Sequence, residues 1–228
     1  MIKNIFLDAG GVILNERNFE ENSARIITQV IHRYNKKYLI ENYWDDVEEA
    51  VYRFIPKVYD YILYKNIGEP DFKKSKDQYK TEIREFNKNF ELLDGIKDFL
   101  FEFSKRYKIG ILGQYGIDFK SYLQEEHLLP YFTYTEIQDD YTITKPDPRY
   151  FEMILAACNC KPEESVMIGD RIDKDIIPAK MVGMKTIRIE VGIHKNQKPR
   201  IPAEKPDITV HTLKELRVEM LKRMDCRA

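Results

Sequence analysis

Short apolar runs bounded by turn-forming residues recur along the chain, and helix-like segments separate most of them. The runs cover residues 2–7, 108–112, 132–137, 166–168, 186–190 and 207–211. Between them, residues 97–107 and 148–158 carry apolar side chains at helical spacing, and the second segment begins at a proline, which is favoured in the first turn of a helix. Strands that alternate with helices in this way predict an α/β fold built on a parallel sheet.

Residues 16–91 have a different pattern, with several amphipathic segments and no convincing strand. One face of the first expected helix carries Ile26, Ile27, Val30, Ile31 and Tyr34. Further helices are expected over residues 41–54, 56–65 and 71–88. We interpret residues 16–91 as a helical domain inserted into a core that residues 1–15 and 92–228 form.

Composition narrows the function classes. The 37 basic and 38 acidic residues nearly cancel, so no strong field attracts nucleic acid or an anionic membrane. No apolar run approaches the roughly 18 to 20 residues that span a bilayer, and we expect a cytoplasmic protein. Cys158, Cys160 and Cys226 are an odd number at a spacing unlike a zinc site, so we expect free thiols. Residues 192–206, rich in lysine and proline, are expected to form a surface loop.

Polar residues follow several apolar runs, at the edge where a parallel sheet binds its ligands. Asp8 opens the turn after one run, and an acidic segment that contains Asp170 follows another. Two carboxylates brought together from two strands would suit Mg²⁺ completed by water and a substrate phosphate. Lys145 would be a fixed positive charge there, and backbone N–H groups at residues 113–115 could cradle phosphoryl oxygens. The pattern predicts phosphoryl transfer on a small phosphorylated substrate.

Together these segments resemble four motifs of the haloacid dehalogenase superfamily, and the resemblance spans nearly the whole chain. The first motif is a hydrophobic strand followed by Asp-x-Asp-Gly-Thr/Val, and residues 5–12 match it except at Gly10. The second motif, a strand that ends in serine or threonine, corresponds in place but not in type to Gly113. The third corresponds to Lys145-Pro146, and the fourth to Gly169, Asp170 and Asp175.

The resemblance implies a Rossmann-like core, a helical cap inserted after the first motif and lying over the strand ends, and a phosphatase that forms an aspartyl-phosphate. Asp8 would be the nucleophile, and Lys145 would steady both the nucleophile and the phosphate. Asp8, Asp170 and the backbone carbonyl of Gly10 would hold Mg²⁺, with Asp175 orienting the metal shell. The N–H groups of Gly113 and Gln114 would bind phosphate.

Two departures from the family pattern bear on activity. Gly10 replaces the aspartate that protonates the leaving oxygen and activates water, help worth roughly 10² to 10⁴ in rate. Gly113 lacks the expected phosphate-binding hydroxyl. Besides a phosphatase with impaired acid–base catalysis, two alternatives remain: a catalytically weak binding or regulatory protein, and a hydrolase of carbon–halogen or carbon–phosphorus bonds. The retained pair Gly169-Asp170 argues against a dehalogenase, which needs no metal. The sequence specifies neither the substrate nor the oligomeric state.

Overall fold

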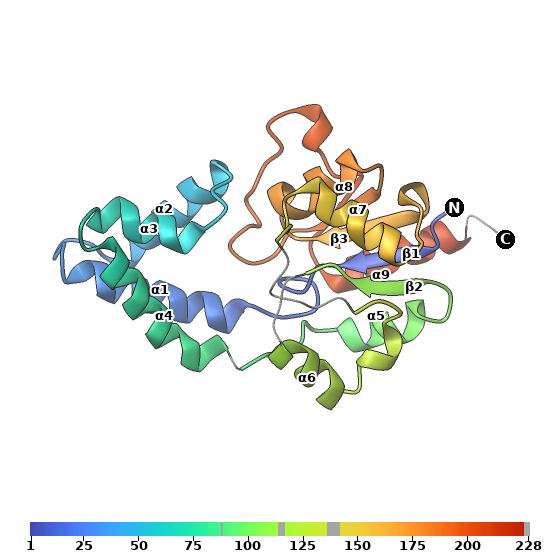
Figure 1. Ribbon diagram of the computed structural model, residues 1–228, viewed down its shortest axis with the longest axis horizontal. Coiled ribbons are helices and arrows are strands. Elements are labelled where there is room, and N and C mark those ends of the chain that lie inside the picture. Colours follow the sequence, from blue (N-terminus) through green and yellow to red (C-terminus); the bar gives the residue numbers. More distant parts are fainter. Residues whose placement is uncertain (88, 114–116, 136–141, 226–228) are drawn as a thin grey trace. The chain divides into compact units, whose positions relative to one another are not determined.

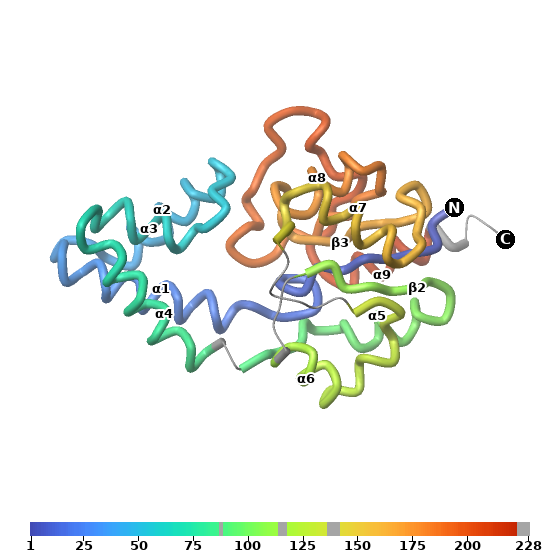
Figure 2. Tube along the Cα trace, in the orientation of Figure 1, coloured from blue at the N-terminus to red at the C-terminus, as the bar shows by residue number. Residues whose placement is uncertain are grey.

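The computed structural model describes residues 1–87, 89–113, 117–135 and 142–225. The chain divides into two compact units, each of which can be followed by residue colour in Figure 1 and along the trace of Figure 2. The core unit comprises Met1–Asn15, Phe90–Val191 and Pro199–Ala228, and the helical unit comprises Glu16–Asn89 and Gly192–Lys198. Each unit has its own buried cluster of apolar side chains.

The core unit is built on a five-stranded parallel sheet with the order β2-β1-β3-β4-β5. The strands are β1 Asn4–Leu7, β2 Lys108–Ile111, β3 Ser165–Gly169, β4 Lys185–Ile189 and β5 Ile208–Val210. Leu7 lies opposite Ile111 on one side and Ile168 on the other, so the carboxyl ends of the three strands are level. Because the chain order reverses at β1, this end of the sheet is the expected ligand-binding edge. The predicted parallel α/β fold is confirmed.

Helices cover both faces of the sheet (Figure 1). They are α5 Ile96–Phe103, α6 Ile117–Glu125, α7 Pro148–Ala157, α8 Ile177–Met181 and α9 Leu213–Asp225. Side chains alternate across a strand, so Ile5 and Leu7 of β1 pack in one cluster with α5 and α9, whereas Phe6 packs in another with α7 and α8. Asp147 begins α7 by accepting a hydrogen bond from the N–H of Arg149 at 2.9 Å, which satisfies one free donor of the first turn.

One predicted strand is largely wrong. Within residues 132–135, Tyr134 forms an isolated parallel bridge to Gly110 and the N–H of Thr133 donates to the carbonyl of Ile109 at 2.8 Å, whereas residues 136 and 137 lie outside the described part of the chain. The 3₁₀ turn Leu129–Tyr131 occupies the preceding residues, so the chain reaches the edge of β2 late and for a short stretch. The helix predicted over 97–107 also ends early, at Phe103.

The helical unit contains α1 Arg17–His32, α2 Ile40–Tyr52, α3 Val58–Ile67 and α4 Phe72–Asn87. The predicted helical insertion after β1 is therefore confirmed, and the α1 positions Ile26, Ile27, Val30 and Ile31 are all buried. Tyr34 is an exception. It follows the end of α1 and is 44% exposed, because the helix stops before the next turn that would have carried its side chain inward.

Residues 192–198 were expected to lie on the surface, and this expectation is wrong for several of them. The N–H of Ile193 donates to Oε1 of Glu20 on α1 at 2.8 Å, and the Ile193 side chain packs against the core of the helical unit. His194 and Gln197 are buried, at 8% and 0% exposure. Gly192 has φ +60°, and a Cβ there would come within 2.6 Å of Oε1 of Glu20, so this close approach requires glycine.

Cys158 is buried and Cys160 is half-buried, and neither of these two cysteines forms a disulfide. Cys226 lies outside the described residues. Among the described residues, no helix combines the length and the apolar character that crossing a bilayer demands.

Candidate active site

The loop after β1 places Asp8 at the carboxyl edge of the sheet. Its N–H continues the strand ladder by donating to the carbonyl of Ile168 at 2.9 Å. The chain then turns back, with the N–H of Leu14 donating to the carbonyl of Ala9 at 2.8 Å. Gly11 makes this turn possible with φ +69°, and a Cβ there would lie 3.2 Å from Asp170. The loop therefore brings the residues after β1 against those after β3.

The segment after β3 forms a short π-helical turn, Ile172–Ile176, which leads into α8. Asp170 and Asp175 are both buried, at 5% and 0% exposure. Oδ2 of Asp175 accepts a hydrogen bond from the N–H of Arg171 at 3.1 Å. This bond closes a turn between the two ends of the acidic segment. Gly169 allows this return, since a Cβ there would lie 2.5 Å from the Cβ and Cγ atoms of Asp175.

Lys145 lies between two of these carboxylates. Its Nζ donates to Oδ1 of Asp8 and to Oδ1 of Asp175, at 2.7 Å in each case, and its side chain is 7% exposed. Burial lowers the pKa of Lys145, but the charges of Asp175 and Asp8 outweigh burial and the pKa is raised overall. Burial raises the pKa of Asp175 to about 6, against the opposing charge of Lys145. Lys145 is thus a fixed, buried cation at this edge.

The carboxylates of Asp8, Asp170 and Asp175 form one compact cluster. One oxygen of each lies within 4.8 Å of the others, so Asp8 and Asp170 approach as closely as expected of residues that share an ion. Such close like charges repel, and a cation relieves the repulsion. Carboxylate oxygens are the donors that Mg²⁺ prefers. The residues present therefore fit a divalent metal ion.

The predicted phosphate-binding residues are only partly described. Gly113 lies two residues after the end of β2 at Ile111, and a Cβ at Gly113 would lie 3.1 Å from Oδ1 of Asp8. A serine or threonine here would therefore crowd the carboxylate in its present position. Gln114 lies outside the described residues. Gly10 does not have the positive φ of its neighbour Gly11, so its backbone conformation does not demand glycine.

Arg188, a buried residue of β4 that contacts this edge, was not among the site residues predicted from the sequence. Its side chain is 2% exposed, and its Nε donates to the backbone carbonyl of Asp170 at 3.1 Å. The available signal was an arginine between Ile187 and Ile189 in the predicted strand 186–190, since a charged side chain is rarely buried without a specific partner.

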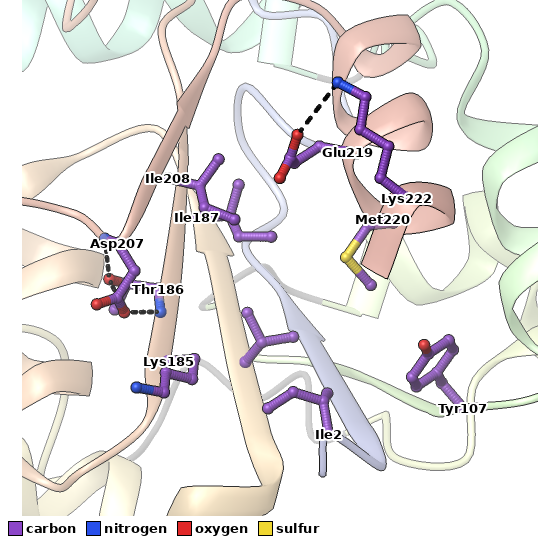
Figure 3. A pocket seen from close by; sticks show the side chains of 11 residues that line it. Ile2, Tyr107, Lys185, Thr186, Ile187, Asp207, Ile208, Glu219, Met220 and Lys222 are labelled. Atoms are coloured by element: carbon purple, nitrogen blue, oxygen red, sulfur yellow. Dashed lines mark hydrogen bonds and ion pairs between the residues drawn. The ribbon is translucent and has the colours of Figure 1, made fainter. Parts of the chain in front are cut away.

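A cavity of about 370 Å³ lies at the amino ends of the strands, opposite the ends that carry the carboxylate cluster (Figure 3). Ile2, Lys185 and Ile208 line it, and these residues stand at or just before the starts of β1, β4 and β5. Met220 of α9 covers part of it. Because Asp8 and Asp170 follow the other ends of the strands, this cavity is separate from the carboxylate cluster.

We predict that Gly169→Ala destabilises the protein by about 1 to 3 kcal/mol or more, since the added methyl overlaps Asp175 in a packed region. Urea unfolding measures the cost. In a double variant with Asp175→Gly, the overlapping atoms are gone, so the cost should be smaller than the sum of the two single costs. Strict additivity would contradict the steric explanation.

The chain is similar to a known protein family and to several named relatives. A family model described as haloacid dehalogenase-like hydrolase matches residues 7–189. Glyceraldehyde 3-phosphate phosphatase of Methanopyrus kandleri is 36% identical over 86 residues, 38% of this chain and 37% of the relative. Phosphoserine phosphatase of Thermus thermophilus is 35% identical over 89 residues, 39% and 34% of the two chains. The chain thus spans about a third to two fifths of the length of these two relatives.

A longer match covers both units. Glyceraldehyde 3-phosphate phosphatase of Pyrococcus abyssi is 25% identical over 211 residues, 84% of this chain and 83% of the relative. Among solved structures, a haloacid dehalogenase-like protein of Agrobacterium tumefaciens has a TM-score of 0.72 at 19% identity and covers 98% of this chain and 100% of its own. The hydrolase YfnB of Bacillus subtilis, bound to magnesium, has a TM-score of 0.66 at 17% identity, with 96% and 98% covered. At these identities the structures show a shared fold.

Proposed function

We propose that this chain, which belongs to the haloacid dehalogenase-like hydrolase family, is a Mg²⁺-dependent phosphatase of a small phosphorylated metabolite. The observation that carries this proposal is the position of Lys145, which contacts both Asp8 and Asp175 within a carboxylate cluster 4.8 Å across. A buried cation beside a carboxylate at the edge of a parallel sheet is suited to bind and stabilise a transferring phosphoryl group.

In this proposal, Asp8 is the nucleophile. A carboxylate oxygen of Asp8 forms a bond to phosphorus as the bond from phosphorus to the leaving oxygen breaks, and the electron pair departs with the leaving group. Water then attacks the aspartyl-phosphate at phosphorus and passes a proton to the surrounding solvent, and the bond from phosphorus to the Asp8 oxygen breaks, which releases phosphate and the free carboxylate. Lys145 binds the phosphoryl oxygens and offsets their charge in both steps.

The remaining site residues are proposed to hold the metal ion and to orient its ligands. Asp8 and Asp170, together with the carbonyl of Gly10, would hold Mg²⁺, and Asp175 would orient the shell around it. When bound, Mg²⁺ supplies positive charge that polarises the phosphoryl group and fixes its orientation. The backbone N–H groups of Gly113 and Gln114 are the proposed phosphate donors in place of a hydroxyl.

Glycine at position 10 limits the class of substrate. It has no side chain that could protonate a leaving oxygen or activate water, so departure of an alkoxide is not assisted at this position. Acyl, enol and aryl phosphates have leaving groups that need little protonation. We therefore expect these to react faster than alkyl phosphates.

The names of the relatives support a small phosphorylated substrate, since they act on glyceraldehyde 3-phosphate and phosphoserine. A second candidate is a catalytically weak protein that binds a metal and phosphate, and the absence of side chains at Gly10 and Gly113 favours it. Carbon–halogen hydrolysis has less support, because that reaction does not use the metal-binding character of the carboxylate cluster.

The test is a panel of phosphorylated metabolites and p-nitrophenyl phosphate, assayed for released phosphate with Mg²⁺ and with EDTA. The proposed function requires saturable turnover that EDTA removes and Mg²⁺ restores. For a binding protein, Mg²⁺ and phosphate would raise the melting temperature with no turnover. Halide release from haloacids in EDTA would instead support a dehalogenase.

We predict that Gly10→Asp raises turnover of alkyl phosphates about tenfold or more, within the range of general acid–base help. Aryl phosphates should gain less, because their leaving groups need less protonation. The φ of Gly10 is not in the left-handed region, so aspartate is compatible with the backbone in this respect. Kinetics on matched alkyl and aryl phosphates check the prediction, and an equal change for both would contradict it.

A further inference from the structure

Among the described residues, Arg188 is one of the largest side chains that are almost fully buried. It lies on β4 opposite Gly169 of β3, one residue before Asp170. Burial lowers the pKa of Arg188, an effect that the charges of Glu190 and Asp170 oppose. Burying a guanidinium costs free energy unless hydrogen bonds and opposite charges compensate. The contacts of Arg188 therefore indicate its role.

Two of these contacts are directional. Nε donates to the backbone carbonyl of Asp170 at 3.1 Å, and Nη1 donates to Oε1 of Glu190 at 2.9 Å. Glu190 is 20% exposed and also lies 3.3 Å from Nδ1 of His211, so it joins the buried guanidinium to the surface. The guanidinium fork is thus oriented by Glu190 on one side and holds Asp170 with the other.

The carbonyl of Asp170 and the N–H of Arg171 belong to one peptide group. That N–H donates to Oδ2 of Asp175 at 3.1 Å. A single peptide plane is therefore held at both ends, by Arg188 at its oxygen and by Asp175 at its nitrogen. Rotation of this plane would displace Asp170 and release Asp175 at the same time. Two of the three carboxylates in the cluster depend on its orientation.

The hydrogen bonds continue from Asp175 to Lys145 and from Lys145 to Asp8, at 2.7 Å each. Hydrogen bonds in such a chain polarise one another, and a cation that donates to a peptide carbonyl makes the N–H of that peptide a stronger donor. We propose that Arg188 is a positioning residue that fixes the peptide between Asp170 and Arg171 and thereby strengthens divalent-metal binding by the carboxylate cluster. This inference rests on the metal role in the proposed function.

The direct test is calorimetric titration of the metal-free protein with Mg²⁺ alone. Arg188→Met keeps an unbranched apolar stem and removes both donors. We expect it to weaken Mg²⁺ binding about 10- to 100-fold, the usual effect of removing a residue that orients a metal ligand. Thr186→Val is the matched control, because Thr186 is also buried on β4 but bonds to Asp207. The control should lose stability and bind Mg²⁺ like the wild type.

Arg188→Lys provides a second variant that is closer to the wild type. It keeps the charge and loses the planar fork, so we expect Mg²⁺ binding between those of the wild type and Arg188→Met. If Arg188→Met does not fold, Arg188→Lys decides the question. If the folded Arg188 variant binds Mg²⁺ as tightly as the wild type, then Arg188 only supports the fold, whatever the stability of the variant. That result would overturn the proposal.

Hydrogen exchange gives a readout that needs neither metal nor activity. In the metal-free protein, the amide of Arg171 should exchange at least about tenfold faster in Arg188→Met than in Thr186→Val, because the peptide is free to rotate. Unchanged exchange would overturn the positioning role. If the wild-type protein binds no Mg²⁺ but Arg188→Met and Thr186→Val still differ in exchange, the proposed function and the gain in metal binding are overturned. The positioning of the peptide by Arg188 is then still supported.

Discussion

Replacing Asp8 by asparagine is expected to abolish phosphate release from aryl and acyl phosphates while leaving the protein folded. The amide keeps the size of the carboxylate but is a poor nucleophile. Removal of a nucleophile that no neighbouring residue replaces costs at least about 10³-fold in kcat. The measurement is steady-state release of p-nitrophenol at saturating Mg²⁺, with the circular dichroism spectrum as the check on folding.

The matched control is Asp98→Asn, which changes an exposed carboxylate in the first turn of α5. It should retain wild-type turnover. The metal-free Asp8→Asn protein should also be nearly as stable as the wild type, because the lost ion pair with Lys145 is offset by reduced repulsion from Asp170 and Asp175. Turnover within tenfold of the wild type would rule out Asp8 as the nucleophile.

The position of these residues at one edge of the sheet could be predicted from the sequence for a physical reason. Parallel strands all end at the same edge, so Asp8 and Asp170 had to lie close together once their preceding runs were assigned to neighbouring strands. Within the described residues no strand directly precedes Lys145, and its place beside Asp8 was expected because a phosphoryl-transfer site needs a fixed positive charge, an expectation that the resemblance of its segment to a family motif supported. Gly169 was part of the fourth motif, but the 2.5 Å approach of Asp175 that requires glycine there became visible only in the structure.

Other features depend on contacts between distant parts of the chain. The burial of Arg188 follows from its pairing with Gly169 and from the carbonyl that it meets, neither of which periodicity reveals. Residues 192–198 read as a polar loop because only a few of them are apolar, yet the hydrogen bond from Ile193 to Glu20 and the packing of the Ile193 side chain join them to the helical unit. Tertiary contacts of this kind override local sequence preference.

Lys145→Met is expected to destabilise the metal-free protein by about 3 to 5 kcal/mol, because removal of one partner leaves buried charges uncompensated. The affected partners are Asp8 and Asp175, whose side chains are 14% and 0% exposed. Urea unfolding with EDTA present measures the loss. Lys97→Met is the control, since Lys97 forms an ion pair with Glu126 at 2.7 Å but is 58% exposed. An exposed pair is worth about 1 kcal/mol or less.

A double variant separates electrostatics from packing. Methionine nearly matches the length of the lysine side chain, so a packing role would leave most of the stability in place. If the charge is what matters, Asp175→Asn introduced into Lys145→Met should recover part of the lost stability, whereas Asp175→Asn alone should destabilise the wild type by removing the negative charge that pairs with Lys145. Mg²⁺ should also stabilise Lys145→Met more than the wild type, because the ion then neutralises carboxylates that have lost their only described lysine partner. Turnover should remain low even at saturating Mg²⁺, since the metal does not replace the ammonium group at the phosphoryl oxygens. Recovery of both stability and turnover with Mg²⁺ would show that Lys145 serves only to balance charge in the metal-free protein.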